Sequence, residues 1–258
     1  MKKYKYRNGQ ILIVDTKIDG VLVFRLVSLL IIIVCLIQIF LWNKDNKSNN
    51  SLISELKSQI VILNSDSGTD SDDTALNFVA LKEQNQDTVA WVKFNNTDID
   101  FPVVKTTNNK YYLNHNFSKE YNSAGWIFAD YRNKFDGSDR NLIIYGHNRR
   151  DGSMFSSLNK ILDDSWYTNP ENHIVTLYTP SGAVNYQVFS IYTIRHTDFA
   201  NTVEFKNAQE YQAYLKGAIN SSIYNFNQQL ATSDKILTLY TCANNNQYRI
   251  ILHAKQIR

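Results

Sequence analysis

An apolar run near the N-terminus constrains the fold of this chain more than any other feature. Residues 21–42 are interrupted only by Arg25, Ser28 and Gln38. As a helix, this run is long enough to cross a bilayer core of about 30 Å. It predicts a transmembrane helix over residues 21–42, and beyond a linker about 180 residues remain, enough for one well-buried domain.

The charges around this run predict its orientation. Residues 1–20 and the start of the run carry two aspartates, Asp15 and Asp19, against six basic residues: Lys2, Lys3, Lys5, Arg7, Lys17 and Arg25. This excess favours a cytoplasmic N-terminus and an extracellular C-terminal domain. A cleaved signal peptide is the main alternative, but the run ends in Phe40, Leu41 and Trp42 without a small-residue cleavage site.

Residues 43–73 are predicted to form a stalk. Leu52, Leu56, Ile60 and Leu63 have helical spacing, which predicts a short amphipathic helix that packs on the domain or a neighbour. The following stretch, residues 64–73, is polar and acidic and has too few apolar groups to fold, so we expect a solvated linker. The folded domain is then expected over residues 74–258, beginning with a helix to about Glu83 that Asp72 or Asp73 would cap.

The remainder of the chain is rich in short β-prone runs. Sixteen tyrosines and thirteen phenylalanines suit a mainly β domain. Helices are expected at residues 153–162 and 208–224. About eight short strands with few helices indicate a closed or nearly closed β-barrel. The strand candidates are residues 89–94, 99–104, 126–129, 142–145, 174–178, 184–194, 235–241 and 248–255.

Three reactive side chains lie at the ends of such runs. Cys242 ends one strand candidate, Arg249 begins the next, and the polar residues 243–247 between them are expected to form a loop. His147 follows the strand candidate 142–145. A thiol, an imidazole and a guanidinium at strand ends are the parts of a cysteine acyl-transfer site. The alternative for Cys242 is a buried, inert cysteine.

Several motifs carry a resemblance to a known family. The pentapeptide TLYTC at 238–242 matches the TLxTC signature of sortases, the membrane-anchored transpeptidases of Gram-positive bacteria. The segments IFADYRN at 127–133, YGHN at 145–148 and DGSMF at 151–155 resemble class B sortases in particular. The resemblance covers roughly residues 75–258 and implies an eight-stranded β-barrel. It also implies that Cys242 is the nucleophile, that His147 transfers protons, and that Arg249 stabilises the oxyanion.

Substrate contacts are expected on the same strands. Tyr145 and Tyr240 each precede a catalytic candidate by two positions and so face the same side of their strands. Residues 109–113 resemble a stretch that lines the substrate groove of class B sortases, which implicates Asn109 and Leu113. The alternative is that the tyrosines only fill the barrel wall. Two departures from the family pattern stand out: Tyr240 occupies a position that is often small, and the loop from Cys242 to Arg249 is short.

The resemblance implies that the partners are surface proteins with a C-terminal sorting signal of the NPxTN or NPxTG kind. The acceptor would be an amine of peptidoglycan or of its lipid-linked precursor, and no cofactor or metal is expected. A net charge of +3 without a dense Lys/Arg run excludes nucleic acid. Three alternatives stay open: a pilus-polymerising sortase, a hydrolytic cysteine peptidase and a non-catalytic tethered domain. The pilus enzymes commonly carry a second membrane segment at the C-terminus, which is not expected after Arg258.

Overall fold

The computed structural model describes residues 2–7, 10–15, 20–65, 77–195, 199–243 and 248–257. Side chains are described from residue 20 onward within these ranges, except those of residues 59–65, 199, 242 and 243. The chain divides into two compact units, Met1–Lys47 and Ser48–Arg258. The predicted acidic linker lies almost entirely outside the described residues.

The first unit holds a β-hairpin and the start of a long helix. Strands β1 (Lys2–Arg7) and β2 (Gln10–Asp15) pair in antiparallel register, and no pattern in residues 1–20 predicted this hairpin. Helix α1 (Gly20–Ser65) follows. From Gly20 to Ser58 this helix is long and apolar enough to cross a membrane, with a mean hydropathy of 3.0 over its most apolar window.

Helix α1 continues through the predicted stalk, and its later part belongs to the second unit. Leu56 is fully buried there, and Leu52 packs against the same core. The Lys57 ammonium lies 3.3 Å from a carboxylate oxygen of Asp100, and Asn49 donates a hydrogen bond of 3.4 Å to the Gly125 carbonyl. The predicted amphipathic helix therefore packs on the domain, whose compact unit begins at Ser48; the side chains of Ile60 and Leu63 lie outside the described residues.

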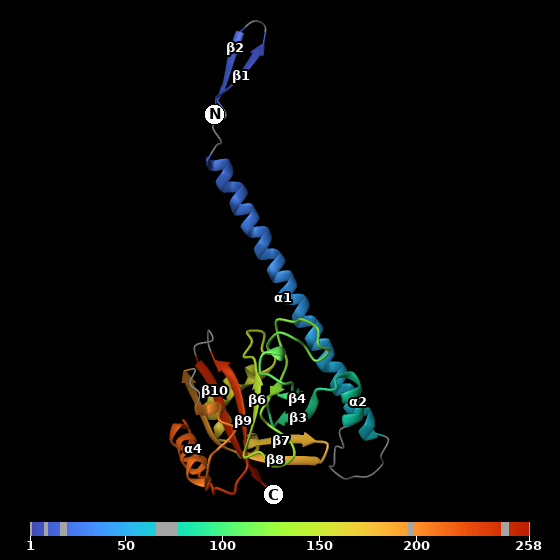
Figure 1. The fold of residues 1–258 in the computed structure, drawn as a ribbon, viewed down its shortest axis with the longest axis vertical. Coiled ribbons are helices and arrows are strands. Elements are labelled where there is room, and N and C mark those ends of the chain that lie inside the picture. The colour runs from blue at the N-terminus through green and yellow to red at the C-terminus, as the bar shows by residue number, and fades with distance from the viewer. Residues whose placement is uncertain are drawn as a thin grey trace. The chain divides into compact units, whose positions relative to one another are not determined.

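Eight strands close into a barrel, as predicted (Figure 1). Their order around the barrel is β10-β8-β7-β3-β4-β5-β6-β9, in which β6 pairs in parallel with β9 and β9 pairs antiparallel with β10. Each predicted strand is present within a few residues of its expected bounds. The strands are β3 (Thr88–Phe94), β4 (Asp100–Val104), β5 (Phe128–Ala129), β6 (Asn141–Gly146), β7 (Ile174–Thr179), β8 (Gly182–Arg195), β9 (Ile236–Ala243) and β10 (Tyr248–Ile257).

The helices of the domain differ from the expectation in detail. Helix α2 (Phe78–Gln84) is capped by Asn77, whose side chain accepts from the Ala80 amide, so the predicted caps at Asp72 and Asp73 are wrong. Helix α4 (Ala208–Ser221) ends three residues early, and the segment predicted as a helix over 153–162 is a 3₁₀ helix, η2 (Phe155–Leu162). Four short elements complete the described part of the domain: η1 (Tyr111–Leu113), α3 (Asp164–Tyr167), η3 (Pro170–His173) and η4 (Phe199–Asn201).

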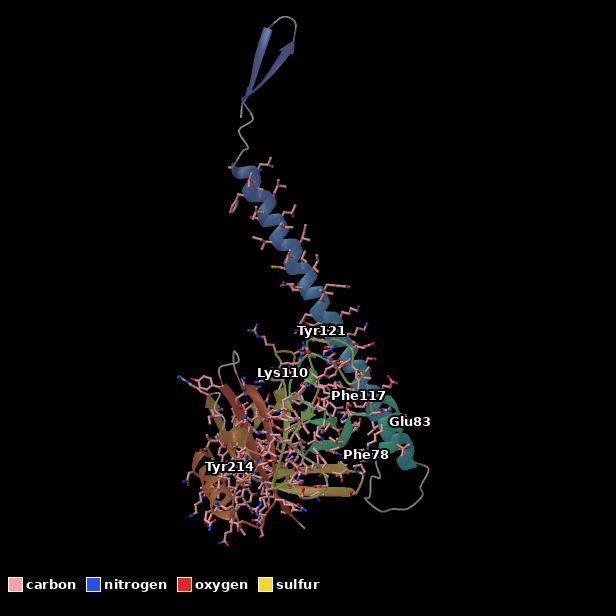
Figure 2. The ribbon with its side chains drawn as sticks, viewed as in Figure 1. Phe78, Glu83, Lys110, Phe117, Tyr121 and Tyr214 are labelled. Atoms are coloured by element: carbon pink, nitrogen blue, oxygen red, sulfur yellow. The ribbon has the colours of Figure 1, made fainter. Side chains whose placement is uncertain are left out.

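The two faces of strands β9 and β10 have different surroundings. Leu237, Leu239, Ile250 and Leu252 point into the barrel and are fully buried in the main core. Because side chains alternate along a strand, Thr238 and Tyr240 share the opposite face. Helix α4, on which Tyr214 lies (Figure 2), covers part of that face. The Tyr214 ring meets the His253 ring edge to face, and the remainder of the face borders the candidate site.

Candidate active site

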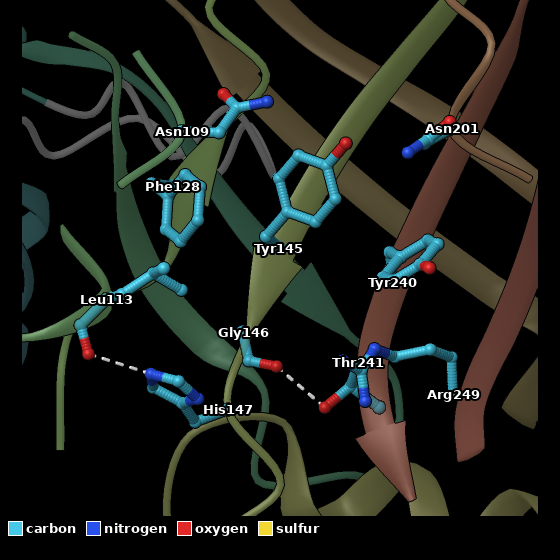
Figure 3. Close-up of a pocket in the computed structure, with 10 residues that line it drawn as sticks. All are labelled: Asn109, Leu113, Phe128, Tyr145, Gly146, His147, Asn201, Tyr240, Thr241 and Arg249. Atoms are coloured by element: carbon cyan, nitrogen blue, oxygen red, sulfur yellow. Dashed lines mark hydrogen bonds between the residues drawn. The ribbon is translucent and has the colours of Figure 1, made fainter. Parts of the chain in front are cut away.

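A pocket of about 240 Å³ lies where strands β6 and β9 end and β10 begins (Figure 3). Six of the seven residues predicted for the site line it. The seventh, Cys242, belongs to β9, but its side chain lies outside the described residues. The lining residues are Asn109, Leu113, Phe128, Tyr145, Gly146, His147, Asn201, Tyr240, Thr241 and Arg249.

The strand register brings Cys242 and Arg249 together. They are direct partners in the antiparallel pairing of β9 with β10. Residues opposite each other in such a pair have Cβ atoms about 5 Å apart and on the same face. The short connection between the two strands therefore keeps Arg249 beside Cys242.

His147 follows β6 and is held through one ring nitrogen. Its Nε2 lies 2.8 Å from the Leu113 carbonyl oxygen, which can only accept, so Nε2 carries the proton in the neutral ring. This leaves Nδ1, on the side of the ring away from Leu113, to take up or release a proton. Burial lowers the pKa of His147; the hydrogen bond to Leu113 opposes that change, and the positive charges of Arg149 and Arg249 add to it.

A glycine allows the close approach that this hydrogen bond needs. Gly125 has a φ of +60°, and a Cβ there would lie 2.7 Å from the Leu113 oxygen and 2.9 Å from Cδ2 of His147. Any larger side chain would push the carbonyl and the imidazole apart. The glycine at position 125 thus allows the hydrogen bond that holds His147 in place.

A second hydrogen bond joins the strands that carry the histidine and the cysteine. The Thr241 hydroxyl, buried, donates to the Gly146 carbonyl over 2.6 Å. Each of these residues is the immediate neighbour of a catalytic candidate, Cys242 or His147. The bond therefore fixes the spacing of the two strand ends at the pocket.

Two tyrosines form the pocket wall between the strands. Tyr145 and Tyr240 are paired across β6 and β9, and their rings meet edge to face with centroids 5.3 Å apart. Tyr145 donates a hydrogen bond of 2.9 Å to Asp130, and Asn109 donates another of the same length to the same oxygen. The tyrosines thus line the pocket, which agrees both with substrate contact and with the alternative that they only fill the barrel wall.

Four lining residues were not predicted as site residues: Phe128, Gly146, Asn201 and Thr241. Gly146 and Thr241 directly precede His147 and Cys242 in their motifs. Phe128 lies in the motif at 127–133, and its position two residues before the polar Asp130 is the signal that could have indicated it. Asn201 lies in η4, on the connection from β8 to α4, and no pattern in the sequence marks it. Only the fold brings that connection to the pocket.

The other histidines stand apart from this pocket. His115 stacks on Tyr111, His173 bonds to the Tyr167 carbonyl, and His253 is fully buried; His196 lies outside the described residues. Among the residues that the structure describes, no group of three His, Cys, Asp or Glu side chains could hold a metal ion.

Comparisons with known proteins agree with this geometry. Residues 92–257 match the sortase domain family. Sortase B of Listeria monocytogenes is 37% identical over 183 residues, which cover 69% of this chain and 72% of that protein. A Staphylococcus aureus sortase B–substrate complex is similar at a TM-score of 0.74 and 30% identity, over 83% of this chain and 99% of that one. A sortase B complexed with triglycine has a TM-score of 0.75 at the same identity and coverage. The predicted resemblance to class B sortases is confirmed.

Proposed function

Because this chain belongs to the sortase family, whose members are cysteine transpeptidases that anchor surface proteins, we propose that it cleaves a C-terminal sorting signal and joins the new carboxyl end to a cell-wall amine. Two observations support the proposal: His147 and Arg249 line one pocket, and the strand register pairs Cys242 with Arg249. The proposed signal is of the NPxTN or NPxTG kind. The proposed acceptor is an amine of peptidoglycan or of its lipid-linked precursor, and the triglycine bound by a related sortase B supports an amine acceptor.

The chemistry proceeds in two acyl transfers. The Cys242 thiol gives its proton to Nδ1 of His147, and the thiolate attacks the peptide carbonyl. The Arg249 guanidinium stabilises the oxyanion that forms. The C–N bond then breaks, and His147 returns the proton to the departing amine, leaving a thioacyl enzyme. In the second step His147 takes a proton from the incoming amine, which attacks the thioester and releases the thiol.

The substrate contacts proposed here are Asn109, Leu113, Tyr145 and Tyr240. All four line the pocket beside His147. Leu113 is 43% exposed and Tyr240 7% exposed, so the wall offers one accessible apolar side chain next to an aromatic surface. An extended peptide that lies along this wall would bring its scissile carbonyl toward the end of β9.

Product analysis tests the proposal directly. The full chain in detergent would be incubated with quenched NPxTN and NPxTG pentapeptides, with and without triglycine, and the products identified by mass spectrometry. We expect cleavage, a triglycine adduct when the amine is present, and complete loss of both in Cys242→Ala. Cleavage without any adduct would indicate a peptidase, and turnover by folded Cys242→Ala would exclude the thioacyl route.

The membrane topology is also proposed. Helix α1 has the length and composition of a membrane span, and the basic excess before it favours a cytoplasmic N-terminus. Protease added to intact protoplasts should then digest the domain from residue 48 onward. Protection of that domain until the cells are lysed would contradict this orientation.

A further inference from the structure

A buried carboxylate lies directly behind the pocket wall. Asp130 directly follows β5 and is fully buried. The Arg132 guanidinium grips it as a fork, with Nε and Nη2 each 2.8 Å from one of its oxygens, and the Arg132 amide adds a third bond of 3.0 Å. Burial by itself would raise the pKa of Asp130, but these bonds, with those from Tyr145 and Asn109, outweigh it and hold the pKa below its usual value. Asp130 is therefore a stable anion at neutral pH.

The anion sets the direction of the Tyr145 hydroxyl. That hydroxyl lies 2.9 Å from Oδ2 of Asp130, and an ionised carboxylate can only accept. The single hydroxyl proton of Tyr145 is consequently committed to Asp130. Burial and the negative charge of Asp130 also raise the pKa of Tyr145, so the phenol stays protonated. What remains for a ligand is the lone pairs of the Tyr145 oxygen, which accept.

The same anion orients the Asn109 amide. Nδ2 of Asn109 donates to Oδ2 of Asp130 over 2.9 Å, and the Asn109 carbonyl oxygen accepts from the Tyr131 amide over 2.9 Å. Each end of the side chain thus has a partner that excludes the flipped orientation. The second Nδ2 proton of Asn109 is left as a donor beside the accepting oxygen of Tyr145.

Arg132 carries the arrangement to another part of the pocket. Its Nη2 also donates to the Asn201 carbonyl over 2.8 Å, and Asn201 lines the same pocket from the connection between β8 and α4. The pair of Asp130 and Arg132 hence ties together two lining segments, at Asn109 and Asn201, that are far apart in the sequence. An ion pair that only stabilised the fold would not need these contacts with residues that line the pocket.

We propose that Asp130, held by Arg132, is a positioning residue that fixes the hydrogen-bonding polarity of the substrate pocket: Tyr145 accepts and Asn109 donates. One acceptor beside one donor complements an amide group, whether in the peptide backbone or in a carboxamide side chain of the substrate. The inference rests on the proposed function, because it takes the ligand of this pocket to be the peptide that Cys242 attacks.

Asp130→Asn makes a specific prediction. The introduced amide has nearly the same shape, but an NH2 group replaces one of the two accepting oxygens. It cannot accept all five bonds from Arg132, Tyr145 and Asn109, so it no longer fixes which of these groups donates to the pocket. A site whose buried polar groups no longer match its ligand discriminates strongly against that ligand. We expect kcat/KM for the quenched NPxTN and NPxTG peptides to fall about 10- to 100-fold, mostly through KM.

Two readouts separate positioning from a loss of structure. The full chain with Cys35→Ser, which removes the other thiol, would be alkylated with iodoacetamide. This small reagent reacts with Cys242 without binding to the pocket wall. Asp130→Asn should therefore change the alkylation rate by less than about threefold. In addition, Tyr145→Phe should lower kcat/KM in the parent chain yet have little further effect in Asp130→Asn. Such non-additivity is expected of residues that act as a unit.

The matched control is Asp139→Asn. Asp139 also accepts several hydrogen bonds, from the Asn133 side chain and the Lys134 and Phe135 amides, but it lines a separate pocket formed by the opposite ends of the strands. It should lower the melting temperature without changing KM or the effect of Tyr145→Phe. If Asp130→Asn does not fold, Arg132→Lys takes its place, since lysine keeps the charge but lacks the planar fork that holds Asp130. We then expect a severalfold rise in KM with normal alkylation.

The outcomes are distinct. Additive losses in Asp130→Asn and Tyr145→Phe, or a fall in alkylation that matches the fall in kcat/KM, would overturn the positioning role. An unchanged KM in Asp130→Asn, or in Arg132→Lys if that variant replaces it, would also overturn the positioning role. A parent chain that is folded and alkylated but cleaves none of the peptides would instead contradict the proposed function.

Discussion

One face of strands β9 and β10 borders two polar regions that differ in how completely they are covered. In the region under α4, His253 is fully buried, and both of its ring nitrogens have partners: Nδ1 lies 2.8 Å from the Thr238 hydroxyl and Nε2 lies 2.9 Å from the Tyr192 hydroxyl. In the open region, His147 has one described partner, the Leu113 carbonyl at Nε2. Helix α4 covers the first region and stops short of the second.

The covered network is complete in itself. The Thr238 hydroxyl donates to Asn141 over 2.7 Å, so it must accept from Nδ1 of His253, which leaves Nε2 to accept from Tyr192. Neutral His253 satisfies each of these bonds, and burial lowers its pKa to about 3. A histidine with both nitrogens engaged stabilises the fold, whereas one with Nδ1 directed at a pocket can move protons.

The largest expected difference between the regions is in activity. His147→Gln should lower kcat/KM by about a hundredfold to ten-thousandfold, the usual contribution of a general acid or base, with little change in melting temperature. His253→Gln should do the reverse, with kcat/KM within about threefold but the free energy of unfolding lower by about 1–3 kcal/mol, because buried hydroxyls lose their partner. Peptide kinetics and urea unfolding on both variants measure this, and equal losses of activity would erase the distinction.

Arg249 tests the open region a second time. Arg249→Lys keeps the charge but loses the planar fork, so we expect kcat/KM to fall roughly tenfold to a thousandfold at nearly constant stability, and Arg249→Ala to be worse. Arg195→Lys is the control, since Arg195 is exposed on β8 and contacts Tyr248 rather than the pocket. Near-normal kinetics for Arg249→Ala would show that another donor holds the oxyanion.

The covered region should control stability against pH. The pKa of His253 lies at about 3 in the folded protein and at 6.5 when unfolded, so the unfolded state binds more protons between those values. Stability is then complete above pH 6.5 and declines as the pH falls, by about 2 kcal/mol from pH 6.5 to pH 5. Urea unfolding of the parent and of His253→Gln would measure the slope, which should be shallower in the variant; identical slopes would remove His253 as its source.

The smallest expected effect concerns the pKa of His147. Positive charge on Arg149, and to a lesser extent on Arg249, lowers that pKa after the larger contribution of burial. Arg149→Gln should therefore raise the pKa of His147 only slightly, because Asp151 already neutralises part of the arginine charge. An NMR titration of the imidazole in a Cys242→Ala background reports it, and a downward shift would contradict the assignment.

Local patterns in the sequence were sufficient for most of the architecture. Short apolar, β-prone runs predicted the eight strands, since such residues fit a buried, pleated surface. The patterns failed in the detail of two helices. Asn77 caps α2 in place of Asp72 or Asp73, and η2 is a 3₁₀ helix. Leu52 and Leu56 predicted a helix, but they could not say which surface would cover it.

The reactive residue types, their order and the strands that carry them follow from the sequence alone, because propensity and periodicity act over a few neighbouring positions. The short connection between β9 and β10 sets Cys242 opposite Arg249, whereas the approach of Leu113 to His147 over Gly125 and the arrival of Asn201 at the pocket come from closure of the barrel. Helix α4 covers His253 and leaves Arg249 at the pocket, although both residues lie on the same face of β10. Such contacts depend on which distant segments meet, and no short stretch of the chain carries that information.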